Sequence, residues 1–298
     1  MYKFIFKFFF FTFVIQSQDK TPFAKYNFQN DSLYNKVLKQ KIESIGNTAN
    51  YKVYQEIAEH AYYYKDWKTV IEYSQKSISI FPNERGFFLL GSASGFASLM
   101  ENKINSIFYL NKMKYGFKNS YNFNAENIVY LKALLLFYSK VPKILGGNMN
   151  LAFKYANELK MISEIEGFLA FAHLAEVNNN FKEAKEQYLN ATNSFDIINQ
   201  DCNNLSLVDI NRRNLLYELS YGQIKFGFVS NNTICMLQFL ESSYSLSDSF
   251  PKKWLYLRLA KAFYFLGELD NYESYINKAM LIDPEFIEVK SFLNNLGE

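Results

Sequence analysis

Two distant stretches of the chain share one pattern of apolar and small residues, and this internal repeat constrains the fold more than any other feature. Residues 253–284 and residues 51–82 carry similar residue types at identical spacing. The matched positions are Tyr54 and Tyr256, Ile57 and Leu259, Ala58 and Ala260, Ala61 and Phe263, Trp67 and Leu269, Val70 and Tyr272, Ser74 and Ile276, Ser77 and Ala279, and Pro82 and Pro284. Small residues at such places let two helices approach closely. The pattern predicts a row of stacked helix pairs.

This pattern resembles the tetratricopeptide repeat, a unit of about 34 residues built from two antiparallel helices. Gly267 opens the turn between the helices of the last copy, and Pro284 ends its second helix. Looser copies lie between the two clear ones, in residues 87–110, 128–162, 168–191 and 217–240. The resemblance implies an all-α fold: a right-handed α-solenoid of about six helix pairs, with a capping helix at each end in residues 31–46 and 284–296.

The first residues have the layout of a secretory signal peptide. Lys3 and Lys7 precede an apolar run, residues 8–15, which a short polar segment follows. The run is too short to span a bilayer well. We predict cleavage after Ser17, a flexible lead-in over residues 18–30, and a solenoid over residues 31–298. The mature protein is then periplasmic or extracellular and has no integral membrane span. The alternative is membrane attachment through an uncleaved N-terminal segment.

Composition and charge narrow the class of partner. Hydrophobic residues make up 49% of the chain and charged residues 20%, so the chain can bury a core. The net charge is only +3, and no basic stripe stands out. Because nucleic-acid binding requires a concentrated positive face, we predict no nucleic-acid partner.

Residues that could carry chemistry are few. His60 and His173 lie in different repeats without the spacing of metal ligands, and the sequence motifs of metalloproteases, serine hydrolases and phosphate-binding loops are missing. Two acid pairs are typical of solvated helix faces, Glu164 with Glu166 and Glu183 with Glu186. We therefore predict that the chain is not an enzyme and that it uses no cofactor and no metal.

Two further features concern loops. Gly146 and Gly147 follow Pro142 and predict a sharp turn between two helices, with unusual backbone angles. This loop also resembles one in exported bacterial repeat proteins, some of which assist the solute-binding proteins of transport systems. Cys202 and Cys235 can form a disulfide in an exported chain, and a buried free Cys235 is the alternative.

The resemblance implies that a partner binds the concave face, which the first helix of each pair lines. Transferred position by position, the places on this face are mostly aromatic and carry few charges. The predicted partner-binding residues are Tyr62, Tyr63, Phe88, Tyr130, Phe137, Tyr138, His173, Phe226, Trp254, Leu257 and Tyr264.

Aromatic rings bury much area at little entropic cost. We therefore predict a non-catalytic exported scaffold that binds a protein or peptide partner. The alternative function is a transport-assisting component that holds a small solute in an internal pocket. For each ring, packing against a neighbouring repeat is an equally open interpretation.

Overall fold

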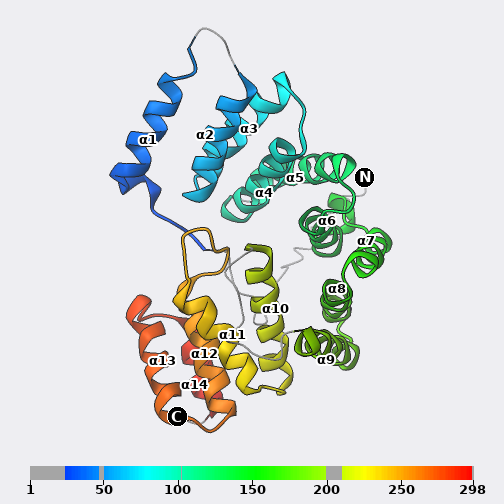
Figure 1. Cartoon of the computed structure of the whole chain (residues 1–298), viewed down its shortest axis with the longest axis vertical. Coiled ribbons are helices and arrows are strands. Elements are labelled where there is room, and N and C mark those ends of the chain that lie inside the picture. Colours follow the sequence, from blue (N-terminus) through cyan, green and yellow to red (C-terminus); the bar gives the residue numbers. More distant parts are fainter. Residues whose placement is uncertain (1–23, 47–49, 102, 199–209, 297–298) are drawn as a thin grey trace, which may run out of the picture.

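The computed structural model describes residues 24–46, 50–101, 103–198 and 210–296. These residues form α-helices and two short 3-10 helices, and they contain no strand (Figure 1). The elements are η1 (Phe28–Asn30), α1 (Ser32–Glu43), α2 (Tyr51–Tyr63), α3 (Trp67–Ile80), α4 (Glu84–Met100), α5 (Lys103–Phe123), α6 (Ile128–Lys140), η2 (Lys143–Leu145), α7 (Met149–Ile162), α8 (Glu164–Val177), α9 (Phe181–Ile198), α10 (Ile210–Phe226), α11 (Asn231–Ser242), α12 (Lys252–Phe265), α13 (Leu269–Ile282) and α14 (Ile287–Leu296).

The helices pack as consecutive pairs between two single helices. The six pairs are α2 with α3, α4 with α5, α6 with α7, α8 with α9, α10 with α11, and α12 with α13. Each pair contacts mainly its neighbours, and the core is divided into clusters that follow one another along the chain. The predicted all-α solenoid of about six pairs, capped at each end, is confirmed.

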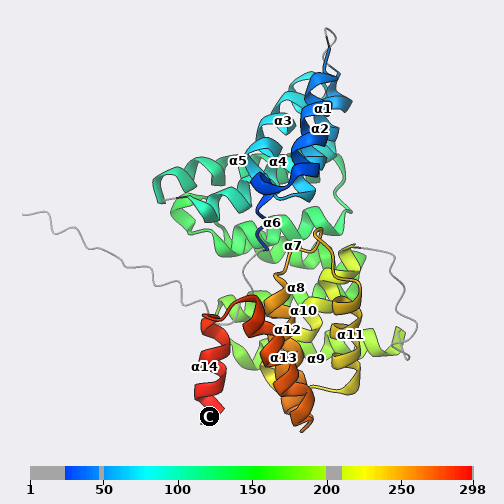
Figure 2. The ribbon, with the colours of Figure 1, turned by 90° about the vertical axis from the view of Figure 1, so that its left-hand side faces the viewer.

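Single helices cover the two ends of the row, as end units of a solenoid must. α1 anchors itself through Tyr34, which is fully buried, stacks on His60 and donates a hydrogen bond to Asp66 Oδ2 at 2.7 Å. At the other end, Phe286 and Val289 bury the start of α14 against the last pair (Figure 2).

The turns inside four pairs share one backbone geometry. One of the two residues after the first helix has positive φ in each of them: Lys65, Asn179, Gly227 and Gly267. The next N–H then donates back to a carbonyl inside the first helix, in the bonds Asp66 to Ala61, Asn180 to Ala175, Phe228 to Gln223 and Glu268 to Phe263. This is the way a helix commonly ends at a left-handed residue. Because the four bonds are alike, the residues whose carbonyls accept them occupy equivalent positions in their pairs.

The abundant asparagines have a structural role at helix starts. Side chains of Asn50, Asn83, Asn127 and Asn148 accept a hydrogen bond from a backbone N–H in the first turn of the following helix. Such caps satisfy N–H groups that have no partner inside the helix.

The turn between α6 and α7 has the predicted sharp geometry. Gly146 adopts φ +103°, and a Cβ on Gly147 would lie 1.7 Å from the carbonyl oxygen of Val141. Only glycine fits both places, so the two glycines are explained by the backbone path alone.

α4 and α5 cross with their backbones in contact, and this crossing yields a stability prediction. A Cβ on Gly116 would lie 2.5 Å from the backbone nitrogen of Gly91 and 2.6 Å from the carbonyl of Phe87. We expect Gly116→Ala to lower the free energy of unfolding by about 2 kcal/mol, because the clash outweighs the gain in helix propensity. Gly95→Ala is the matched control, since its Cβ would meet only the flexible side chain of Met113. Equal urea midpoints for the two variants would contradict the assignment.

The first helices form the inner row of the solenoid. α2 packs on α4, α6 on α8, α8 on α10, and α10 on α12. α7, by contrast, lies outside α6 in Figure 1. The inner side of a curved row is shorter than its outer side, so helices on it come closer together. We call the side lined by the first helices the inner face.

The solenoid curves far enough for its two ends to meet. Lys65 Nζ, in the turn of the first pair, donates to the carbonyls of Leu246 at 2.5 Å and Asp248 at 3.2 Å, in the loop before α12. The N–H of Ala24 donates to the Ser249 carbonyl at 2.7 Å. In Figure 1 this loop meets the beginning of the described chain. We call these contacts the clasp.

The clasp makes stability depend on pH through Lys65. Burial lowers the pKa of Lys65 to about 8, from 10.5, although Asp248 opposes the shift. The folded chain then binds fewer protons than the unfolded one between these values, so this lysine adds stability as the pH rises. We expect wild type to gain roughly 2–3 kcal/mol over Lys65→Met between pH 7.5 and pH 10. Urea unfolding of both proteins at the two pH values measures this gain. The prediction is contradicted if the free energies of unfolding of the two proteins change with pH in parallel.

Three sequence predictions concern the remaining segments. The signal peptide and Cys202 lie outside the described residues, while Cys235 on α11 is disulfide-bonded. Of the predicted lead-in, the described part holds η1 and a buried Ala24. Within the described ranges, no helix combines the length and the apolar character needed to cross a membrane.

Candidate functional site

The structure separates the predicted partner-binding residues into three groups. Five lie in the core: Tyr130, Phe137, Tyr138, Trp254 and Leu257. Five are half-buried: Tyr62, Phe88, His173, Phe226 and Tyr264. Only Tyr63 is exposed. Most of these rings pack against others, for example Phe88 on Tyr130, Tyr138 on Tyr155, and Tyr264 on Phe292.

A shift of register in α6 explains three of the buried residues. The prediction placed Ala133 at the close contact between helices, but Ala133 is half-buried and the deepest side chains are Leu131 and Leu134. The helix therefore sits about half a turn from its predicted orientation. Lys132 reaches the inner face in place of Tyr130.

α10 also lies about two residues from its predicted register. Gln223 accepts the turn bond that Ala61 accepts in the first pair, so it occupies the inter-helix position and not the predicted inner one. Gln223 is accordingly buried, and it donates to Thr192 Oγ1 at 3.2 Å. Tyr221 and Lys225 lie on the inner face in place of Leu219 and Phe226.

The corrected registers bring three charges together on the inner face. Lys132 Nζ on α6 contacts Glu166 Oε2 at 2.8 Å on α8 and Glu218 Oε2 at 2.9 Å on α10. The triad thus ties three consecutive first helices. The sequence predicted a solvated helix face for both Glu164 and Glu166. Glu164 is exposed as predicted, but the prediction is wrong for Glu166, which is buried.

The pKa shifts show how the triad balances its charges. Burial lowers the pKa of Lys132, but Glu218 and Glu166 outweigh burial and raise it above its usual range. Burial raises the pKa of Glu166, and Lys132 offsets only part of this rise. Lys132 is therefore the group that favours the ionised form of Glu166.

A second polar cluster lies farther along the inner face, around Glu176. This buried carboxylate accepts from Tyr188 at 3.0 Å, from Tyr221 at 3.2 Å and from Lys225 at 3.0 Å. The contacts join α8, α9 and α10. Beside them, the guanidinium of Arg258 on α12 lies 3.5 Å from the ring centroid of Tyr217.

A cavity of about 170 Å³ opens between α10, α12 and α14. Its walls combine apolar and aromatic side chains with three cations and no acid: Tyr221, Ile224, Lys225, Trp254, Leu257, Arg258, Lys261, Phe265 and Phe292. The indole N–H of Trp254 is buried and has no hydrogen-bond partner among the described residues. A buried donor of this kind normally has an acceptor. We call this place the inner cavity.

The size of the inner cavity suits one bulky side chain. Pockets for whole small molecules usually measure about 300–1,000 Å³. This comparison weighs against an internal pocket for a solute. It favours a longer ligand that inserts one apolar group and places negative charge near Lys261.

The remaining candidates for chemistry stay apart. His60 stacks on Tyr34, and His173 Nε2 lies 2.9 Å from Ser139 Oγ in another part of the row. In the part of the chain that the structure describes, no three His, Cys, Asp or Glu side chains are grouped to hold a metal ion.

Comparisons with known proteins support the fold. No protein-family model matches the chain, and no curated protein matches it. A crystal structure of a tetratricopeptide repeat protein from Parabacteroides merdae ATCC 43184 superposes with a TM-score of 0.51 at 12% identity, covering 88% of this chain and 91% of that one. Yeast Tom70 gives a TM-score of 0.43 at 15% identity, covering 88% of this chain and 58% of that one. The chain has the α-solenoid fold of tetratricopeptide repeat proteins.

Proposed function

We propose that this chain is an exported, non-catalytic scaffold that binds an acidic segment of a partner protein on its inner face. The inner cavity is the observation that carries the proposal. It offers aromatic walls for one bulky apolar side chain, the Lys261 cation for a neighbouring carboxylate, and an indole N–H that has no acceptor among the described residues. Opposite charge across an interface selects the partner and speeds its association.

A library of random peptides displayed on phage tests this proposal without knowledge of the natural partner. Selection on the wild-type chain is expected to enrich peptides that combine acidic residues with a bulky apolar residue. Lys261→Glu and Phe265→Ser each remove one feature of the inner cavity at a partly exposed position. We expect both to weaken the binding of enriched peptides at least tenfold, since each removes about 1.4 kcal/mol or more.

Lys182→Glu is the matched charge control, because Lys182 is an exposed lysine on the outer helix α9. It should leave peptide binding unchanged. The proposal fails if no acidic peptides are enriched, or if Lys261→Glu and Lys182→Glu weaken binding equally.

A further inference from the structure

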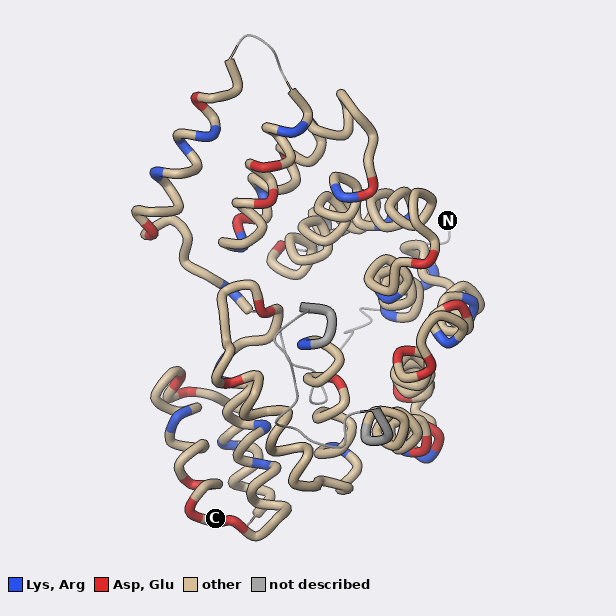
Figure 3. The backbone as a smooth tube through the Cα atoms, viewed as in Figure 1, with Lys and Arg blue, Asp and Glu red and all other residues tan. Residues whose placement is uncertain are grey.

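Positive charge is concentrated in the middle of the chain, although the net charge of the whole is small. Residues 102–163 contain two acids, Glu126 and Glu158, and nine lysines: Lys103, Lys112, Lys114, Lys118, Lys132, Lys140, Lys143, Lys154 and Lys160. The chain has 32 basic and 29 acidic residues in all, so the rest holds 23 basic and 27 acidic ones. The net charge of the whole chain hides this asymmetry because the two parts nearly cancel. Figure 3 marks the charged positions along the backbone.

The outward sides of α5 and α7 combine these lysines with exposed apolar residues. α5 exposes Phe108, Tyr115 and Lys118, and α7 exposes Phe153, Lys160 and Met161. Phe108 is 60% exposed and Met161 is 79% exposed. The two helices are neighbours, because Tyr121 on α5 hydrogen-bonds to Glu158 on α7 at 3.0 Å. We call these six outward residues the outer basic surface.

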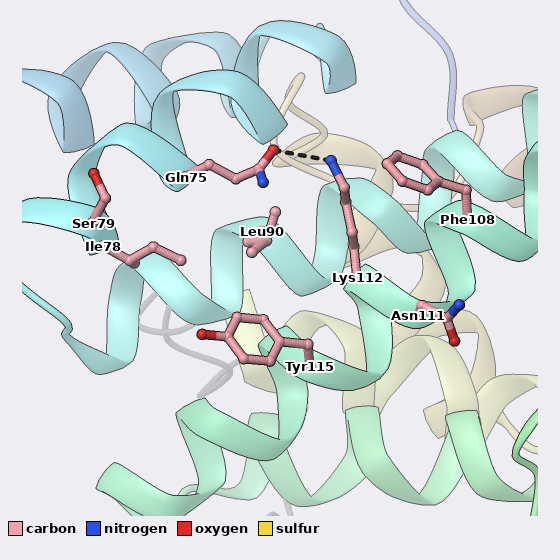
Figure 4. A pocket seen from close by; sticks show the side chains of 8 residues that line it. All are labelled: Gln75, Ile78, Ser79, Leu90, Phe108, Asn111, Lys112 and Tyr115. Carbon is pink, nitrogen blue, oxygen red and sulfur yellow. Dashed lines mark hydrogen bonds between the residues drawn. The ribbon is translucent and has the colours of Figure 1, made fainter.

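A hollow of about 520 Å³ adjoins this surface, between α3 and α5 (Figure 4). Leu90 and Ile78 contribute apolar walls, while Phe108, Lys112 and Tyr115 line the α5 side. Lys112 Nζ is half-buried, and it contacts the neutral Gln75 Oε1 at 3.0 Å and the Phe108 ring at 4.5 Å. Burial lowers the pKa of Lys112, and no carboxylate opposes the shift. An anion at the hollow would supply the missing counter-charge.

The outer helices α9 and α13 do not combine exposed lysines and exposed apolar residues in the same way. α9 exposes Lys182 and Lys185 beside Glu183 and Glu186, so its charges balance. α13 exposes Leu281 among acids and asparagines, without an exposed lysine. α5 and α7 thus differ from α9 and α13 in combining exposed lysine and apolar side chains with no exposed acid.

The residue types favour a lipid surface over a protein partner. All cations in residues 102–163 are lysines, and none is arginine. Protein interfaces are enriched in arginine and depleted in lysine. Helix faces that lie on membranes use lysines for the headgroups and aromatic or aliphatic side chains for the boundary with the acyl chains.

We propose that the outer basic surface docks this protein onto bilayers with anionic headgroups, leaving the inner face open to a partner. The lysines contact lipid phosphates, and Phe108 and Met161 enter the headgroup region. An anionic headgroup occupies the hollow beside Lys112. This docking is independent of peptide binding on the inner face.

Vesicle flotation with the full chain tests the proposal. Vesicles of phosphatidylcholine with 30% phosphatidylglycerol serve as the anionic probe, and phosphatidylcholine alone measures any binding through residues 1–23. We expect anionic vesicles to bind the chain and salt to weaken this binding. Lys118→Glu/Lys160→Glu should lower binding at least about 30-fold, since each lysine near such a surface contributes about 1 kcal/mol. Phe108→Ser/Met161→Ser should lower it about tenfold or more.

Matched variants make the result decisive. Lys182→Glu/Lys185→Glu makes the same change in net charge on α9, and Leu281→Ser/Ile287→Ser removes equally exposed apolar residues near the C-terminal end. Both should bind anionic vesicles like wild type. The proposal is overturned if neutral vesicles bind the chain as well as anionic ones, or if control and test variants lose binding equally. It is also overturned if the outer basic surface captures an acidic protein but no vesicles. Competition by soluble glycerol phosphate as strong as by vesicles would likewise count against it.

Discussion

Arg213→Met is expected to lower the free energy of unfolding by about 3–5 kcal/mol, the largest effect of any single change considered for this chain. Arg213 binds Asp248 through two parallel hydrogen bonds, Nε to Oδ1 at 2.7 Å and Nη2 to Oδ2 at 2.8 Å. The Asp248 side chain is only 1% exposed. Removing the guanidinium leaves this carboxylate buried without its counter-charge. Asp248 also accepts from Ser245 N–H and anchors the loop that Lys65 and Ala24 contact, so the clasp should loosen.

Urea unfolding followed by circular dichroism measures this loss. Arg213→Met/Asp248→Asn should recover a large part of the stability, since the amide keeps the shape of the side chain without its charge. Arg85→Met breaks an exposed ion pair with Glu59 and should cost less than about 0.5 kcal/mol. A loss below 1 kcal/mol for Arg213→Met would show that Asp248 is solvated.

Lys132→Met is expected to cost about 2–4 kcal/mol, because it leaves Glu166 buried beside a second carboxylate, Glu218. Lys132→Met/Glu166→Gln should recover most of this loss. The methionine keeps the packing of the lysine stem, so the single variant isolates the effect of charge.

The cost of Lys132→Met should also depend on pH. Glu166 has a raised pKa when folded, and the variant removes the cation that limits this rise. When a carboxyl group has a raised pKa in the folded state, the protein loses stability as the pH rises through that pKa. The protein regains this stability when the group is protonated. The loss should therefore be larger at pH 8 than at pH 5. A loss that is equal at both pH values, with no recovery by Glu166→Gln, would assign the effect to packing.

The sequence predicts the fold well because the fold depends on spacing. Ala58 and Ala260 lie at equivalent contacts, and both are fully buried. The turns that follow α2 and α12 place Lys65 and Gly267 in the same left-handed conformation. Two copies of one pattern therefore suffice to predict helix pairs, their order and the capping helices.

The site depends on features that spacing does not determine. In α6 and α10 several apolar residues follow one another, so a register two residues away buries as much surface as the predicted one. The triad of Lys132, Glu166 and Glu218 appears only once both registers are known. The clasp joins residues 181 to 225 positions apart, and its position depends on the accumulated curvature of all the pairs.

The same reasoning changes which residues we expect a partner to contact. Trp254 and Leu257 are core residues whose edges line the inner cavity. We now expect Lys261 and Phe265 to contact the partner, in place of the predicted aromatic groove. We then expect charge, more than aromatic area alone, to select the partner.

Photo-crosslinking tests the proposed recognition by the inner face most directly. Benzoyl-phenylalanine is placed at Phe265, which lines the inner cavity and is 50% exposed, or at Phe81, which follows α3 and is 52% exposed. Each full-length protein is irradiated in an envelope extract. We predict a discrete protein adduct from position 265 that an enriched acidic peptide suppresses, and no such adduct from position 81. An adduct from position 81 alone, or one from position 265 that the peptide leaves unchanged, would contradict recognition by the inner face.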